Sequence, residues 1–300
     1  MEIKQDLELK NYTTFKIGGK CRKVAFPETK EELVSLLIEN PNTIVLGSCS
    51  DVLISSHGVI EPVIITSNVK NFEFEANKVK VECGAKGPFI SKECQERGLS
   101  GFEFMIGFPG SFGGMLNMNA SAHNQQVSDY FTRGKVFSRK KKKVLEFKKS
   151  DMDFEYRCSN IAKTGDILLE AEFELPGKDK NEIQELMDRN IEFRRLRQPS
   201  LATPNAGSVF KNPENDSAGR LLDMAGAKGM QSGGASVWER HANFIVNSDN
   251  ATSLDVLTLI YKMIATVNDR YRIRLNPEIK YIGIKETEEY RLWELIKTQK

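Results

Sequence analysis

The sequence predicts an α+β protein built from several compact domains, and three observations support this. Segments with strand-like alternation, such as residues 78–83, are interspersed with helical patterns, such as 254–267. The chain has 300 residues, 40% of them hydrophobic, which is enough for two or three domains. A Pro176-Gly177 pair precedes a long helical pattern and marks a domain boundary.

The first predicted domain, residues 1–67, is a small α/β unit. Strand-like segments at 22–27 and 43–47 flank one helix. That helix is predicted to start after Thr29, because Glu32 stands three residues later, the spacing of a capping box. Its apolar face consists of Leu33, Leu36 and Leu37.

A loop of small and polar residues, 47–51, follows the second of these strands. Its sequence is Gly-Ser-Cys-Ser-Asp, which can present several backbone N–H groups together. A strand that ends in such a loop can hold a phosphate.

Residues 59–66 also have the composition of a strand, but Pro62 lies among them. Proline cannot donate a hydrogen bond to a neighbouring strand, so we expect this strand at a sheet edge or with a bulge.

The second predicted domain, residues 68–177, combines strands with one amphipathic helix, 88–97, which Gly98 can cap. A turn or short helix is expected at 150–157, and the basic run 139–143 is interpreted as a solvated hairpin without assigned function. The predicted strands are 78–83, 133–138, 144–147 and 166–175.

The centre of this domain is the apolar stretch 101–119, which four glycines and a proline interrupt. Glycine allows a positive φ or a close approach, and a buried backbone with open N–H groups suits a phosphate or the edge of a ring. The alternative is a tight turn that leads into a core helix. The glycines after Ile106 are Gly107, Gly110, Gly113 and Gly114.

The third predicted domain, residues 178–284, begins with a connector helix at 178–197. Further helices are expected at 218–225 and over 254–267, and a strand at 243–246. A charged, helix-prone tail, 285–300, closes the chain, and its residues Leu292, Trp293 and Ile296 are expected to pack on the body.

Composition excludes several classes of function. The net charge is only +2, so no polyanionic partner such as nucleic acid is indicated. Five widely spaced cysteines without a C-x-x-C pair argue against disulfides and zinc and fit a reducing cytoplasm. No export signal, no membrane-spanning run and no histidine cluster for a metal is found. The common nucleotide-binding and hydrolase motifs are also absent.

Three residues stand in contexts that can carry chemistry. Ser208 follows a glycine in a loop and can act as a nucleophile or proton donor, although this segment alone favours a serine that caps a helix or turn. Arg157 and Glu278, taken singly, are more often surface charges or salt-bridge partners.

Seven motifs together resemble the UDP-N-acetylenolpyruvoylglucosamine reductase family, keep its order and cover nearly all of residues 11–283. The resemblance implies a flavoprotein fold of the vanillyl-alcohol oxidase type, in which two N-terminal domains hold FAD and a C-terminal domain covers the substrate. The motifs are residues 11–19, 46–53, 101–119, 156–157, 206–213, 241–247 and 275–278.

The resemblance also implies the reaction, a step of peptidoglycan precursor synthesis and hence of cell-wall growth and division. NADPH reduces the flavin, and the flavin delivers hydride to C3 of the enolpyruvyl group of a nucleotide sugar. Arg157 then holds the substrate carboxylate, and Ser208 protonates C2. Glu278 matches a glutamate beside the enolate, where we infer that it is protonated or hydrogen-bonded into place.

The binding residues follow from the same resemblance. We also expect a monomer, and the composition described above indicates a cytoplasmic protein without a metal, membrane or nucleic-acid partner. The expected FAD contacts are Gly47, Ser48, Cys49, Ser50, Asp51, Gly107, Pro109, Gly110, Gly113, Gly114, Asn117 and Asn119. The expected substrate contacts are Tyr156, Arg197, Asn212 and His241.

This chain departs from the family pattern at three positions. Asp51 replaces an asparagine, and an anion beside a phosphate is unfavourable unless its side chain turns away. Ser121 and Glu155 stand where glycine is common. The short spacing from Arg157 to Ser208 indicates the family branch without an extra substrate-covering loop.

Two alternatives remain open at this stage. One is another oxidase or dehydrogenase of the same flavin-binding fold, which would not need Ser208 for its chemistry. The other is a catalytically silent nucleotide-binding protein that uses the basic patches near Arg139 and Arg194.

Overall fold

The computed structural model describes residues 1–298, and their contacts divide the chain into two compact units. The chain passes from one unit to the other several times. The first unit comprises residues 1–4, 23–48 and 62–194, and the second comprises 5–22, 49–61 and the chain from 195 onward.

These units group the chain by contacts, and the predicted domains 1–67, 68–177 and 178–284 stay predictions. Residues 5–22 and 49–61, from the first predicted domain, belong to the unit that holds the C-terminal third.

The first unit contains two sheets and five helices, with the last turn of α5 in the second unit. Its helices are α1 (Lys30–Glu39), α2 (Gly87–Glu96), α3 (Phe112–Asn117), α4 (Asn160–Thr164) and α5 (Lys180–Arg197), with 3₁₀ helices η2 (Glu103–Gly107) and η3 (Lys149–Met152). Its strands are β2 (Lys20–Phe26), β3 (Ile44–Leu46), β5 (Val63–Ile65), β6 (Phe72–Glu75), β7 (Lys78–Glu82), β10 (Phe131–Ser138), β11 (Lys143–Lys148) and β12 (Ile167–Glu174), with a short hairpin of β8 (Ser121–Ala122) and β9 (Gln125–Gln126).

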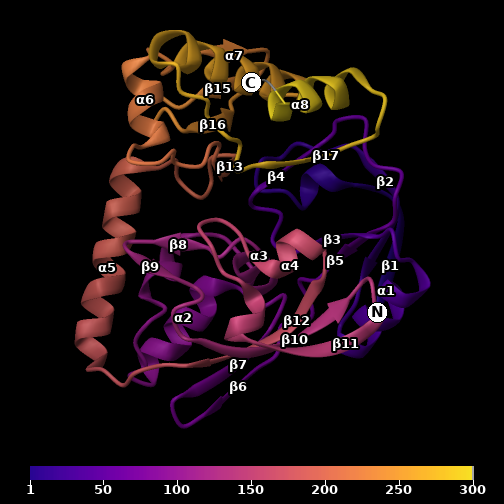
Figure 1. Cartoon of the computed structure of the whole chain (residues 1–300), viewed down its shortest axis with the longest axis vertical. Coiled ribbons are helices and arrows are strands. Elements are labelled where there is room, and N and C mark those ends of the chain that lie inside the picture. The colour runs from indigo at the N-terminus through magenta and orange to yellow at the C-terminus, as the bar shows by residue number, and fades with distance from the viewer. Residues whose placement is uncertain (299–300) are drawn as a thin grey trace. The chain divides into compact units, whose positions relative to one another are not determined.

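The larger sheet is antiparallel and has the strand order β11-β10-β12-β7-β6 (Figure 1). The four predicted strands of this region and the helix capped near Gly98 are confirmed. Buried aromatic side chains from the sheet, η2 and α3 form one core, among them Phe102, Phe112 and Phe173. The glycine-rich stretch is therefore anchored by its phenylalanines on this sheet.

The smaller sheet has the order β1-β2-β5-β3, where β1 (Glu2–Glu8) is the N-terminal strand. The strand with Pro62 does not lie at a sheet edge, because β5 lies between β2 and β3 and pairs with both in parallel. The other predicted alternative, a bulge, agrees with the register, which shifts by one residue between the Cys21–Val59 bridge and the Val24–Val63 pair. β5 begins at Val63, after the proline. Pro62, which has no N–H, lies between the Val59 bridge and the first paired residue of β5, and its carbonyl accepts from Ile44 N–H at 2.9 Å.

Helix α1 begins as the capping box predicts. Thr29 adopts an extended conformation, and its hydroxyl accepts a hydrogen bond from Glu32 N–H at 3.2 Å. The predicted apolar face is buried against residues of both sheets, with Ile64 and Phe137 among its neighbours.

The second unit is built around an antiparallel sheet of order β13-β16-β15-β14. Its strands are β13 (Asn205–Ser208), β14 (Gln231–Ser232), β15 (Ala235–Val237), β16 (Phe244–Asn247) and the parallel pair β4 (Val52–Ile54) and β17 (Lys280–Ile282). Its helices are α6 (Ala218–Met224), α7 (Ser253–Tyr271), α8 (Glu288–Thr298) and the 3₁₀ helix η1 (Leu9–Asn11).

The core of this unit joins residues from both ends of the chain. Phe15, Ile17 and Leu53 are buried in the same cluster as the apolar faces of α6, α7 and α8. The predicted packing of the tail is confirmed, because Trp293 and Ile296 belong to this cluster.

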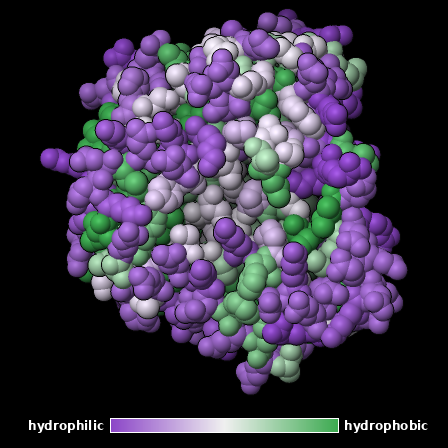
Figure 2. All heavy atoms as spheres, turned by 180° about the vertical axis from the view of Figure 1, so that it is seen from behind, coloured by the Kyte–Doolittle hydropathy of each residue, from purple (hydrophilic) through white to green (hydrophobic). Residues whose placement is uncertain are grey.

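Hydrophilic side chains cover most of the face seen in Figure 2, and apolar side chains appear there in small groups. Within residues 1–298, no helix combines the length and the apolar character needed to cross a membrane.

Candidate active site

The glycine-rich stretch, 101–119, folds as η2 and α3 joined by an extended loop. Backbone hydrogen bonds hold it against the segment that follows β7. Gly87 N–H donates to the carbonyl of Gly110 at 3.0 Å, and Gly113 N–H donates to the carbonyl of Cys83 at 2.8 Å. The loop and the start of α3 are therefore fixed by main-chain contacts.

Two of the predicted cofactor glycines lie in tightly packed positions. A Cβ at Gly113 would lie 3.2 Å from Cys83 Cβ, and a Cβ at Gly47 would lie 2.1 Å from Ser111 Oγ. The closeness of Gly47 to Ser111 shows that the loop 47–51 begins beside the glycine-rich stretch, within the first unit.

Two other predicted cofactor positions leave something open for a ligand. A Cβ at Gly114 would come no closer than 3.7 Å to Ser111 Oγ, so packing does not demand glycine there. Asn119 is 2% exposed and donates its amide hydrogens to Gln126 and to the carbonyl of Glu155. Its Oδ1 accepts no hydrogen bond from residues 1–298, which is costly for a buried acceptor. Space beside a glycine and an open acceptor fit the flavin expected here.

Arg157 lies in a tight loop of the first unit. Mutual backbone hydrogen bonds between Glu155 and Cys158, at 3.1 and 3.2 Å, close the loop, and Arg157 has a φ of 54°. Its guanidinium Nη1 donates to Ser121 Oγ at 2.8 Å and lies over the ring of Tyr156, with Cζ 5.4 Å from the ring centroid. These contacts fix the orientation of the guanidinium.

The Arg157 loop is tied to the C-terminal end of α3. Asn119 donates to the carbonyl of Glu155 at 3.1 Å, and Ser159 Oγ donates to the carbonyl of Asn117 at 2.8 Å. The first unit thus brings together the start of the phosphate loop, the glycine-rich stretch and Arg157.

The two residues that stand where glycine is common in the family, Ser121 and Glu155, both have side-chain partners in the folded chain. Ser121 supplies the hydroxyl that accepts from Arg157, and the Glu155 carboxylate pairs with Lys163 at 2.7 Å. Sequence reasoning missed the role of Ser121, because its partner is 36 residues away along the chain.

Ser208 and Glu278 lie on neighbouring segments of the second unit. Ser208 ends β13 and pairs with Phe244 of β16, after a register irregularity at which Gly207 adopts a φ of +74°. Glu278 N–H donates to the carbonyl of Val209 at 2.8 Å. The backbone of Glu278 is therefore bonded to the residue that follows Ser208.

The N-terminal motif, residues 11–19, is distant in sequence from β13 and β16 but is hydrogen-bonded to both strands. Thr14 Oγ1 donates to the carbonyl of Asn205 at 2.7 Å, and Asn247 Nδ2 donates to the carbonyl of Phe15 at 3.1 Å. Both β13 and β16 are thus held by a segment that lies 191 and 232 residues away along the chain, respectively. In the sequence, the only indication that residues 11–19 support these strands is that they form one of the seven family motifs.

The predicted substrate residues Asn212 and His241 meet at the start of α6. Asn212 Oδ1 accepts from Ala218 N–H at 3.1 Å, and a Cβ at Gly219 would lie 2.7 Å from His241 Cε1. His241 Nδ1 accepts from Asn243 N–H at 3.2 Å. Burial lowers the pKa of His241, which favours the neutral ring that can accept this bond.

The remaining predicted contacts are less strongly defined. Arg197 is exposed at the end of α5. Cys49 adopts a φ of 50°, and burial raises the pKa of its thiol to about 12, so the thiol stays protonated at neutral pH. The carbonyl of Asp51 accepts from Lys280 N–H at 3.2 Å. The ligand roles of these residues stay predictions.

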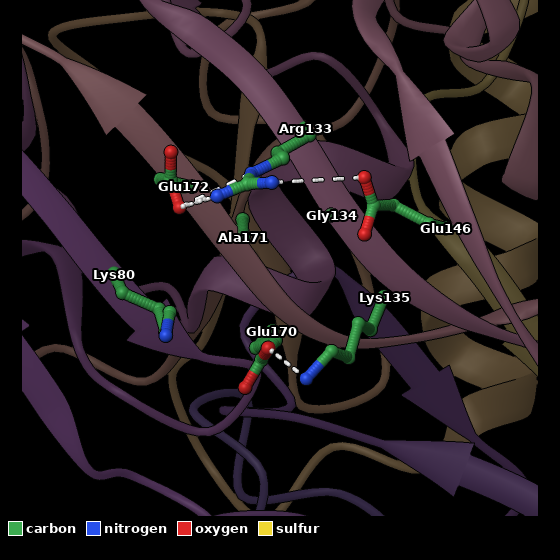
Figure 3. A pocket seen from close by; sticks show the side chains of 8 residues that line it. All are labelled: Lys80, Arg133, Gly134, Lys135, Glu146, Glu170, Ala171 and Glu172. Atoms are coloured by element: carbon green, nitrogen blue, oxygen red, sulfur yellow. Dashed lines mark hydrogen bonds and ion pairs between the residues drawn. The ribbon is translucent and has the colours of Figure 1, made fainter.

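A charged hollow of about 240 Å³ lies on the larger sheet of the first unit, and none of its residues belongs to the predicted site (Figure 3). Its charges pair across strands: Arg133 with Glu172 at 3.0 Å, and Lys135 with Glu170 at 2.9 Å. The lining residues are Lys80, Arg133, Gly134, Lys135, Glu146, Glu170, Ala171 and Glu172.

Comparison with known proteins shows a relation over almost the whole chain. A family model described as the C-terminal domain of UDP-N-acetylenolpyruvoylglucosamine reductase matches residues 198–282. The reductase of Caldicellulosiruptor bescii is 41% identical, over 96% of this chain and 93% of the relative. The reductase of Lactobacillus acidophilus is 38% identical, over 94% and 96% respectively.

The crystal structure of UDP-N-acetylenolpyruvylglucosamine reductase from Thermus caldophilus is similar to this structure. The TM-score is 0.82 at 31% sequence identity, and the match covers 94% of this chain and 99% of the other. The predicted α+β fold class is confirmed by this similarity. The extent and level of these similarities show that the chain is an oxidoreductase that belongs to the UDP-N-acetylenolpyruvoylglucosamine reductase family.

Proposed function

We propose that this protein reduces UDP-N-acetylglucosamine enolpyruvate to UDP-N-acetylmuramate, with FAD as cofactor and NADPH as co-substrate. It acts as a cytoplasmic monomer in peptidoglycan precursor synthesis. The observation that carries the proposal is the attachment of the Arg157 loop to the C-terminal end of α3. This attachment supports the proposal, because it joins the loop of Arg157 to the glycine-rich stretch in a chain of this family.

The chain's own residues would hold FAD through backbone and small side chains. Gly47 and Gly113 allow segments to approach closely, Gly114 leaves room, and the open Oδ1 of Asn119 can accept from a ring N–H. FAD, when bound, supplies a hydride for C3 of the enolpyruvyl group.

Arg157 binds the substrate carboxylate in this proposal. Addition of hydride to C3 leaves negative charge at C2, which spreads into the adjacent carboxylate. A planar guanidinium can donate two parallel hydrogen bonds to that carboxylate and stabilise the charge as it develops. Ser121 and the ring of Tyr156 keep the guanidinium in one orientation, so little reorganisation is needed.

Ser208 donates the proton to C2, and the hydride and this proton together complete the two-electron reduction of the double bond. Serine is a weak acid, so it acts only on a strongly basic carbanion within hydrogen-bond distance. Glu278 lies on the neighbouring segment, where a protonated or hydrogen-bonded carboxyl group assists at the enolate.

For the nucleotide-sugar part of the substrate, we propose contacts with Tyr156, Arg197, Asn212 and His241. The position of both Asn212 and His241 against the first turn of α6 supports this assignment, because the lowered pKa of His241 favours a neutral ring and the amide of Asn212 is anchored to the backbone.

One experiment tests the proposal against its alternatives. The purified protein is examined for the visible absorption of flavin, and NADPH oxidation is followed with and without UDP-N-acetylglucosamine enolpyruvate. Flavin with substrate-dependent NADPH oxidation is expected. Flavin without that dependence would indicate another oxidase or dehydrogenase of this fold, and a colourless protein would indicate a silent nucleotide-binding protein.

A further inference from the structure

Glu289, the second residue of the C-terminal helix α8, is buried at the meeting point of four segments of the second unit. It is 2% exposed. Its Oε2 accepts from Ser55 Oγ at 2.6 Å and from Tyr281 OH at 2.9 Å, and its Oε1 accepts from Ser253 Oγ at 2.6 Å. His57 Nε2 lies 3.8 Å from Oε1.

A buried carboxylate is tolerated only where hydrogen bonds replace its hydration. Three hydroxyl groups do so here, and hydrogen bonds to a charged acceptor are stronger than those between neutral groups. The donors are fixed in turn: Ser56 and Ser253 exchange two hydrogen bonds, at 2.7 and 2.9 Å, and both Ser55 and Ser253 are fully buried. Such a preorganised site indicates that the position of Glu289 matters.

Glu289 acts on the parallel strand pair β4 and β17. Ser55 directly follows β4, and Tyr281 is the central residue of β17. A Cβ at Gly283 would lie 2.2 Å from Tyr281 OH and 2.9 Å from Ser55 Cβ, so glycine is needed for the two side chains to converge. The carboxylate therefore links β17 to the residue after β4 through the side chains of Tyr281 and Ser55.

Strand β17 begins two residues after Glu278. Lys280 N–H bonds to the carbonyl of Asp51, and Glu278 N–H bonds to the carbonyl of Val209, next to Ser208. The position of Glu278, two residues before β17, therefore depends on the position of β17. The hydrogen bond from Tyr281 to Glu289 helps to fix that strand.

We propose that Glu289 is a positioning residue for Glu278, so that the C-terminal helix α8 is part of the catalytic apparatus. This inference rests on the proposed function. It assigns a role to the tail beyond packing: through Tyr281, Glu289 holds Glu278 at a fixed height relative to Ser208. The reaction of the reduced enzyme with the enolpyruvyl substrate depends on this contact, whereas the reaction of the oxidised enzyme with NADPH does not.

The test uses Glu289→Gln in the full-length, flavin-loaded protein. Glutamine keeps the shape but offers fewer acceptor sites to the three hydroxyl groups. Glu288→Gln is the matched control. It removes the same charge from the preceding residue, whose side chain is exposed. The two half-reactions are measured separately in an anaerobic stopped-flow instrument, per mole of bound flavin, so that a loss of folded protein does not count.

In Glu289→Gln, NADPH is expected to reduce the flavin, seen as bleaching, at the wild-type rate. Reoxidation of the flavin by the enolpyruvyl substrate, seen as recolouring, should slow by on the order of 10²-fold, as for other small misplacements of a catalytic group. Glu288→Gln is expected to match the wild type in both steps. Equal slowing of both steps, or no slowing of recolouring, would overturn the proposal.

If Glu289→Gln does not fold, Tyr281→Phe provides the second test, because it removes only the hydroxyl that links β17 to Glu289. Slower recolouring with normal bleaching supports the proposal, and unchanged recolouring refutes it. A wild-type protein that the substrate does not recolour at all refutes the proposed function and this inference together. Failure of the variants alone to show the effect refutes only the role of Glu289.

Discussion

Ser208 is the residue whose assigned role depends most on its surroundings, because serine is a poor acid. Ser208→Ala should leave bleaching of the flavin by NADPH intact, since no proton is delivered to C2 in that step. Turnover with the enolpyruvyl substrate should fall by about 10²- to 10⁴-fold. Stopped-flow and steady-state rates measured on one preparation check this. Equal loss in both steps would exclude Ser208 as the proton donor.

Ser121 orients Arg157 in this chain, although glycine is common at this position in the family. Ser121→Ala removes the hydroxyl that accepts from the guanidinium at 2.8 Å. We expect kcat/KM for the enolpyruvyl substrate to fall on the order of tenfold, the value of one hydrogen bond to a charged group. Glu155→Gln is the control, because its carboxylate pairs with Lys163 and not with Arg157. Unchanged kcat/KM in Ser121→Ala would show that Arg157 needs no such support.

At the scale of single residues, the sequence identified candidates but not their partners. Arg157, Ser208 and Glu278 could be named from motifs. The contacts of Arg157 with Ser121 and of Ser208's strand with Thr14 depend on the folded path of the chain, and no local pattern encodes them. The same holds for Glu289, which in sequence is one of several charges on a polar helix.

Among the elements, α3 offers a direct test of where the flavin lies. Gly114→Ala should not lower the stability of the flavin-free protein, because the nearest atom to the new Cβ is 3.7 Å away and alanine favours the helix more than glycine does. Flavin retention should fall, since the methyl group occupies space kept for the ring. Thermal unfolding and flavin content after gel filtration measure the two effects. Gly177→Ala, with only the carbonyl of Gly98 at 4.0 Å, is the control, and equal flavin content in both variants would contradict this placement.

Helix α1 is joined to the larger sheet by the buried carboxylate of Glu170, which contacts Lys30 and Lys135. Burial by itself would raise the pKa of Glu170, but the hydrogen bonds and charges of the two lysines outweigh it and the pKa is lowered. A lowered carboxyl pKa stabilises the fold above the unfolded-state pKa of about 4.3, and this contribution is lost as the pH falls through the folded-state value.

Glu170→Gln should therefore reduce the free energy of unfolding at pH 7 by about 1.5–3 kcal/mol. The difference from the wild type should shrink below a pH of about 4. Urea unfolding at several pH values measures it. Glu146→Gln, whose exposed carboxylate lies 3.8 Å from Arg133, should have little effect at any pH. A Glu170→Gln deficit that persists undiminished in acid would refute the ionic origin.

Element boundaries were predictable where a local signal existed. The capping pair Thr29 and Glu32 gave the start of α1, and apolar periodicity gave α7 and the strands of the larger sheet. The edge position predicted for the strand near Pro62 was wrong, because proline's effect depends on whether it falls inside the paired residues, and here it falls just before them.

For the whole molecule, the order of motifs predicted the fold class but not the path of the chain. Residues 5–22 and 49–61 pack with the C-terminal third, and β4 pairs with β17 more than 200 residues later. Such pairing is set by burial of Phe15, Ile17 and Leu53 in a core that forms only when both ends of the chain meet. Sequence spacing carries no information on it.

In the proposed reaction, Arg157 holds an enolpyruvyl substrate that takes up hydride from bound flavin at C3 and a proton from Ser208 at C2. The most direct measurement is absorbance near 450 nm of the anaerobic protein after bleaching with one equivalent of NADPH. Addition of UDP-N-acetylglucosamine enolpyruvate should restore the oxidised spectrum without oxygen, with formation of UDP-N-acetylmuramate. A spectrum that stays bleached until air is admitted would contradict the proposed reaction.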